Sequence, residues 1–154
     1  MAENVDATKA PVTGAQIRAA CARVVPAIEI VDSCFGPKWK EAGGLNVTAE
    51  NGAHGRFILG GGHEAAPASF DAEGIKVQIL VNGKVEREGS GAAVDGGAFE
   101  ATAWLANQLG ARGIALRKGD IITTGTTTVP WVGNAGEDVV ARFEGLGEVS
   151  IKFE

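Results

Sequence analysis

The chain has 154 residues, 45% of them hydrophobic, and a formal net charge of −5. This length fits one domain with one sizeable core, and the hydrophobic share is too high for a disordered chain. Because the 14 basic side chains are not clustered as a duplex-binding surface requires, we expect no nucleic-acid partner. No apolar run approaches the roughly 20 residues of a membrane span, and residues 1–11 lack the apolar core of a signal peptide. We therefore expect a cytoplasmic protein with no membrane partner.

The start of the chain predicts a polar segment followed by a helix. Residues 1–12 are mostly polar, and we expect them to form a flexible lead-in to a single domain over residues 13–154. Thr13 is a suitable N-cap for a helix over residues 14–25, where apolar residues recur at helical spacing. Pro26 is expected to end that helix, because proline cannot continue the backbone hydrogen bonding.

Most of the remaining chain predicts short strands, because runs rich in β-branched residues are bounded by Gly, Pro, Asn or Asp. Asn82-Gly83 lies between two such runs and predicts a tight hairpin turn. A second helix is expected over residues 98–109, with Trp104 on its apolar face and therefore in the core. Residues 36–55 are expected to be irregular. The predicted strands cover residues 27–31, 56–59, 76–81, 84–88, 121–124, 139–143 and 149–153. Together these elements predict a mainly β domain of the α+β class.

Several short segments stand in the order and spacing of one enzyme family. They are residues 26–33, 51–55, 82–84, 103–107, 119–126 and 143–149. From about Val12 to Phe153 the chain resembles the 2-keto-4-pentenoate hydratase and 4-oxalocrotonate decarboxylase branch of the fumarylacetoacetate hydrolase superfamily. The resemblance implies a twisted, barrel-like β core with a few flanking helices, which agrees with the elements predicted from the residues.

The resemblance also implies a chemistry. Enzymes of this branch act on small 2-keto or 2-hydroxydienoic acids in the catabolism of aromatic compounds, with Mg²⁺ or Mn²⁺ as cofactor. We therefore expect a hydratase acting on 2-hydroxypenta-2,4-dienoate-type acids. Two alternatives stay open: a 4-oxalocrotonate-type decarboxylase, and a binding or assembly module that kept the fold and lost the metal site.

One residue is a candidate metal ligand. Glu29 matches the third of the three carboxylates that hold the metal in this family, although a lone strand glutamate is also commonly a solvated side chain. The family's Glu-x-Glu pair would precede it, but upstream only Glu3 and Asp6 are acidic, without that spacing. We expect the missing carboxylates to come from elsewhere, through a homo-oligomer or a complex with a chain that supplies the family's N-terminal segment.

Other candidates are weaker, and no catalytic residue is assigned. The resemblance implies substrate-binding roles for Asn51, Gly125 and Thr126, although Asn before Gly is often a turn residue and a Thr-rich run is often plain strand. The family often has serines where this chain has Ala53 and His54. The histidines, His54 and His63, are each expected in a polar loop rather than in catalysis. Glu86 and Glu88 have the spacing of a carboxylate pair but are expected to be solvated beside the hairpin turn.

Overall fold

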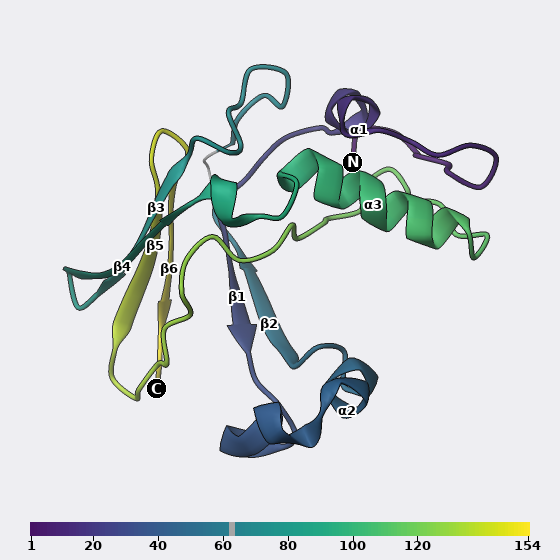
Figure 1. Cartoon of the computed structure of the whole chain (residues 1–154). Helices are drawn as coiled ribbons and strands as arrows, with labels where there is room; N and C mark the ends of the chain where they lie inside the picture. The colour runs from purple at the N-terminus through teal and green to yellow at the C-terminus, as the bar shows by residue number, and fades with distance from the viewer. Residues whose placement is uncertain (62–63) are drawn as a thin grey trace.

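A computed structural model describes residues 1–61 and 64–154 of the chain (Figure 1). His63 therefore lies outside the described residues. None of the described helices is both long and apolar enough to cross a membrane. The elements in chain order are α1 (Gly14–Ala20), β1 (Ala27–Val31), η1 (Gly36–Ala42), α2 (Gly44–Ala49), β2 (His54–Leu59), β3 (Lys76–Val81), β4 (Lys84–Ser90), η2 (Gly91–Ala93), α3 (Ala98–Gly110), β5 (Asp138–Phe143) and β6 (Gly147–Lys152).

The described strands form two antiparallel sheets. One is a four-stranded sheet in the order β4-β3-β5-β6, and the other is a two-stranded ribbon of β1 and β2. Asn82 and Gly83 both have positive φ, 49° and 82°, as the predicted hairpin turn between β3 and β4 requires. The mainly β, α+β prediction is confirmed, but the described strands do not join into one closed barrel.

A helical layer packs at the end of the molecule that carries the N-terminus (Figure 1). Thr13 caps α1 as predicted, and a capping box with Gln16 completes the helix start. The helix ends at Ala20 rather than residue 25, because the chain turns to an extended conformation at Cys21 and Val24 then pairs with Ala65.

The face by which α3 packs on α1 differs from the predicted one. Trp104 is 65% exposed, so its placement in the core was wrong. The buried side of α3 instead carries small side chains, including Ala103 and Ala106. These pack with Ile17 and Ala20 of α1, which shows that close approach of the two helices, rather than side-chain size, decides which stripe is buried.

The first twelve residues belong to this layer. Val5 is buried and pairs with Leu116 as an isolated antiparallel bridge. The Asn107 side chain donates to the Val12 carbonyl and accepts from the Val12 N–H, at 2.9 and 2.8 Å. The first twelve residues are therefore joined to α3 by the Asn107 side chain and to Leu116, after α3, by backbone hydrogen bonds.

The ribbon of β1 and β2 extends away from the helical layer, and β1 contacts β6 of the four-stranded sheet (Figure 1). Its far end carries η1 and α2, in a stretch for which the sequence predicted no regular structure, and neither helix has a buried residue. We call residues 27–59 the arm. Because the arm contributes no residue to the buried core clusters, its shape depends mainly on the hydrogen bonds between β1 and β2.

The predicted strand at residues 121–124 does not form. The segment from 121 to 133 lies between α3 and β5 and contains no helix or strand. Among the described residues, none of its backbone N–H groups donates a hydrogen bond to another backbone group. A strand needs a partner as well as β-branched residues, and the described chain offers none here.

We predict that hydrogen exchange separates this segment from the sheet. The amides of residues 121–133 are expected to exchange at near random-coil rates in the isolated chain, because no backbone acceptor protects them. The amides of residues 77–81 and 139–143, paired in the ladder between β3 and β5, are expected to exchange far more slowly. Exchange measured by mass spectrometry on peptides from both regions checks this, and equal protection would contradict it.

Candidate functional site

The candidate site is centred on Glu29, the middle residue of β1. Its Oε1 lies 2.8 Å from Nδ1 of His54, the first residue of β2. The two side chains are 43% and 35% exposed, so the pair is partly solvated yet open to a ligand. The structure thus confirms the strand around Glu29 and corrects the placement of His54, which lies in a strand rather than in a polar loop.

A β-bulge brings the two side chains together. Glu29 pairs with Phe57 and Ile30 with Arg56, but Val31 then pairs with His54, so Gly55 is skipped. In a regular ladder Gly55 would face Val31, and His54 would point to the opposite side of the ribbon. The extra residue in β2 moves His54 to the face that carries Glu29.

Only glycine fits at the bulge. A Cβ added to Gly55 would lie 2.6 Å from Cβ of Asp32 and 3.0 Å from the carbonyl oxygen of Ile30. Both distances are shorter than ordinary packing contacts, so β1 can approach β2 this closely only without a side chain at position 55. The glycine therefore sets the register that pairs His54 with Glu29.

The end of the ribbon nearest the site is held by Glu50. Its carboxylate accepts a hydrogen bond from the Ser33 hydroxyl at 2.6 Å and from the Cys34 N–H at 2.9 Å. Hydrogen bonds from the Cys34 and Ser33 side chains lower the pKa of Glu50, and the same carboxylate raises the pKa of the Cys34 thiol. These contacts tie the chain after β1 to the chain before β2, and a thiol with a raised pKa is a poor nucleophile.

Asn51 lies in the turn that leads into β2. Its φ of 63° is positive, and its carbonyl accepts a hydrogen bond from the His54 N–H at 3.3 Å. The structure therefore brings Asn51 near the Glu29 and His54 pair through the backbone. It also shows the turn geometry that commonly selects Asn before Gly. A contact with substrate stays a prediction.

Gly125 and Thr126 lie elsewhere, in the extended segment before β5. Gly125 has a φ of 116°, and the Thr126 hydroxyl donates to the Thr128 carbonyl at 3.3 Å. Thr126 lines a shallow groove beside the end of β4. No hydrogen bond or ion pair among the described residues links this segment to Glu29, so it forms a second region rather than part of the Glu29 site.

Glu137 fixes the end of this segment. Its carboxylate accepts hydrogen bonds from the Trp131 indole at 2.9 Å and from the Asn134 N–H at 3.0 Å. The Trp131 hydrogen bond, followed by those from Asn134, lowers the pKa of Glu137. The Arg87 guanidinium of β4 lies over the Trp131 ring, 5.0 Å from its centroid. This cation–π contact joins the segment to the four-stranded sheet.

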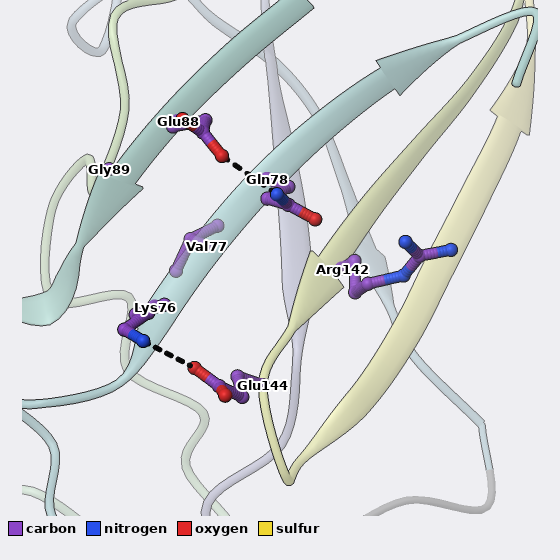
Figure 2. A pocket seen from close by; sticks show the side chains of 7 residues that line it. All are labelled: Lys76, Val77, Gln78, Glu88, Gly89, Arg142 and Glu144. Atoms are coloured by element: carbon purple, nitrogen blue, oxygen red, sulfur yellow. Dashed lines mark hydrogen bonds and ion pairs between the residues drawn. The ribbon is translucent and has the colours of Figure 1, made fainter. Parts of the chain in front are cut away.

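A polar hollow lies on the four-stranded sheet (Figure 2). Figure 2 shows Lys76 paired with Glu144, at 3.6 Å, and Gln78 donating to Glu88, at 2.8 Å. The other member of the carboxylate pair, Glu86, forms an ion pair with Lys84 at 2.9 Å. Because Glu86 and Glu88 are held by separate partners, they do not act together as a pair of metal ligands.

The donors near Glu29 suit a hard divalent cation in kind but not in number. Carboxylate oxygens are the ligands that Mg²⁺ and Mn²⁺ prefer, and about six oxygens surround such an ion. Among the described residues, no group of three or more His, Cys, Asp or Glu side chains could hold a metal ion. Glu29 therefore fits as one ligand of a set that needs further oxygens.

Comparison with known proteins identifies the family of the chain. Residues 16–154 match the family described as fumarylacetoacetate (FAA) hydrolase C-terminal. The chain belongs to this family. It is 38% identical to the 2-hydroxyhexa-2,4-dienoate hydratase of Comamonas testosteroni over 142 residues, which cover 92% of this chain and 53% of that enzyme.

Relatives in the family include decarboxylases as well as hydratases. The chain is 34% identical to the 4-oxalocrotonate decarboxylase of Pseudomonas putida in an alignment of 157 positions, gaps included, that covers 99% of this chain and 58% of that enzyme. It superposes with a TM-score of 0.83, at 33% identity, on the solved 4-oxalocrotonate decarboxylase from Pseudomonas putida G7 complexed with magnesium and adipate. That match covers 99% of this chain and 59% of the solved one.

The family resemblance and the fumarylacetoacetate hydrolase type of fold predicted from the sequence are thus confirmed. The chain spans little more than half the length of these relatives. Sequence reasoning missed the contact of His54 with Glu29, because that contact depends on a bulge that no local pattern predicts.

We predict that Gly55→Ala disrupts the site by forcing β1 and β2 apart. Overpacking of this kind typically costs about 1–3 kcal/mol. Chemical denaturation should show the loss, and the ring signals of His54 in NMR spectra should shift as the contact with Glu29 breaks. Gly44→Ala is the matched control in the same arm, because a Cβ there meets no atom within 4 Å and φ is not positive. Equal effects of the two substitutions would contradict this account of the bulge.

We also predict that acid breaks the hydrogen bonds that the Glu137 carboxylate accepts from Trp131 and Asn134. Because the folded-state pKa is lowered, the stabilisation is present above the ordinary glutamate pKa and is lost as the pH falls through the folded value. Trp131 fluorescence should change in that acidic range. The change should be absent from Glu137→Gln, which does not titrate, and a variant that kept it would rule out Glu137 as its source.

Proposed function

We propose that this chain forms the C-terminal half of a metal-dependent lyase that adds water to 2-hydroxypenta-2,4-dienoate-type acids. The observation that carries the proposal is the 38% identity to a 2-hydroxyhexa-2,4-dienoate hydratase over 92% of the chain. The similarity to the family includes β1, where Glu29 presents a half-exposed carboxylate. The proposed substrates are small 2-keto or 2-hydroxydienoic acids, which are products of aromatic catabolism.

Glu29 is the residue of this chain that would hold the cation, Mg²⁺ or Mn²⁺. The complex of the similar decarboxylase with magnesium and adipate supports a divalent ion beside a small organic acid. A cation at Glu29 would supply positive charge that stabilises negative charge developing on a keto or enol oxygen of the substrate.

The remaining oxygens would come from the substrate, from water and from polypeptide outside residues 1–61 and 64–154. These further oxygens are needed because the described residues offer no group of three or more metal-ligating side chains, whereas such a cation is surrounded by about six oxygens. In this proposal the protein oxygens come from another copy of this chain or from polypeptide equivalent to the part of the relatives that the match does not cover. The arm is a suitable region for such contact, because it exposes apolar side chains such as Val31, Phe35 and Leu59.

A decarboxylase is the second candidate. It is supported by the similarity to 4-oxalocrotonate decarboxylase in both sequence and structure. Hydration adds water across a carbon–carbon double bond, whereas decarboxylation releases CO₂ and keeps the carbon skeleton otherwise intact. The two reactions therefore leave different products from related acids, and one preparation can be assayed for both.

The test uses the chain purified from its native host together with whatever polypeptide accompanies it. With Mg²⁺ or Mn²⁺, we expect 2-hydroxypenta-2,4-dienoate to lose its diene absorbance without release of CO₂. Release of CO₂ from 4-oxalocrotonate instead would favour the decarboxylase. Failure of both reactions with either cation would favour a non-catalytic assembly module.

We predict that Glu29→Gln lowers kcat of this preparation at least ~100-fold, because the amide keeps the shape of the side chain but removes the anionic ligand. Glu144→Gln is the matched control, since Glu144 lies in the turn between β5 and β6 and its carboxylate forms an ion pair with Lys76. It should keep full activity. Unchanged activity of Glu29→Gln would exclude Glu29 as a metal ligand.

A further inference from the structure

We propose that His54 is a positioning residue that orients the Glu29 carboxylate for a divalent cation. The inference rests on the proposed function and deepens it, because it assigns a role to a side chain that does not itself bind the ion. It starts from one contact, the 2.8 Å approach of His54 Nδ1 to Glu29 Oε1.

This contact occupies one oxygen of Glu29 and leaves the other for a ligand. Among the described residues, Oε1 has a hydrogen-bond partner and none is found for Oε2. With 43% of the Glu29 side chain exposed, the second oxygen is open to solvent ions. An imidazole N–H that donates to Oε1 leaves Oε2 available to a cation.

The geometry shows that the pair is built by the backbone rather than formed by chance between flexible side chains. His54 reaches the Glu29 face only because Gly55 is skipped in the ladder, and no larger residue fits at position 55. Bulges commonly re-aim a side chain beside a functional site. The His54 N–H also donates to the Asn51 carbonyl, so the backbone at position 54 is held as well.

Orientation of a ligand before the ion arrives has a known physical effect. A glutamate side chain on a solvated strand samples several rotamers, and binding must select one of them. A second residue that donates to the ligand removes part of this selection cost, and loss of such a partner typically weakens metal affinity about 10–100-fold. His54 is placed to supply this effect to Glu29.

The tautomer of His54 gives a test that needs no metal. In the full chain labelled with ¹⁵N, long-range ¹H–¹⁵N spectra should show His54 protonated at Nδ1, and His63→Gln identifies the signals of the other histidine. Glu29→Gln should change this tautomer balance, because the carboxylate has two acceptor oxygens whereas the neutral amide has one acceptor oxygen and one donor nitrogen. If the tautomer balance of His54 is the same in Glu29→Gln as in the unsubstituted chain, the proposal is overturned.

The metal test uses Mn²⁺ alone as the probe, with the full chain and its variants, each prepared with the accompanying polypeptide that supplies the remaining oxygens. Paramagnetic broadening of the Glu29 signals, followed through a titration, gives a dissociation constant even for weak binding. We expect His54→Ala to weaken Mn²⁺ binding about 10–100-fold. His54→Gln should bind close to the unsubstituted chain, because its amide N–H can still donate to Glu29. Circular dichroism of each variant confirms that the fold persists.

Each outcome decides a different claim. If His54→Gln is as weak as His54→Ala, imidazole itself is required and the positioning role is wrong. If neither variant changes Mn²⁺ binding at Glu29, only this inference fails and the metal site stands. If Mn²⁺ broadens no signal near Glu29 in the unsubstituted chain together with its accompanying polypeptide, both the metal role in the proposed function and this inference are overturned.

Discussion

The candidate site depends on the antiparallel pairing of β1 with β2. The arm contributes nothing to the buried core clusters, so backbone hydrogen bonds rather than apolar packing hold its two strands in register. A slip of one residue would turn Glu29 and His54 to opposite faces, because strand side chains alternate. The bulge at Gly55 shifts that register beside Val31, where it brings His54 to the face that carries Glu29.

Sequence patterns predicted the elements whose cause is local. Asn82-Gly83 forms a tight turn because both positions tolerate positive φ, and Thr13 caps a helix because its hydroxyl meets a free backbone N–H. The strand around Glu29 was predicted from a short run of β-branched residues, and the family from the order and spacing of several short segments along the chain.

Features that depend on distant partners were not predictable in the same way. Trp104 belongs to an apolar stripe of α3, but a second stripe of small residues allows α1 to come closer and is the one buried. Ile121 and Ile122 favour a strand, yet a strand forms only beside another. His54 lies next to Glu29 only through a bulge, and a one-residue shift between strands leaves no mark in composition or periodicity.

The unpaired stretch between α3 and β5 has a consequence for the behaviour of the chain in the cell. An extended segment with free backbone donors and exposed Ile121, Val129 and Val132 is a template on which other chains can add strands. Pro130 interrupts this template, because it has no N–H and disfavours a long ladder. The proline therefore limits the length of any ladder that another chain could form on this segment.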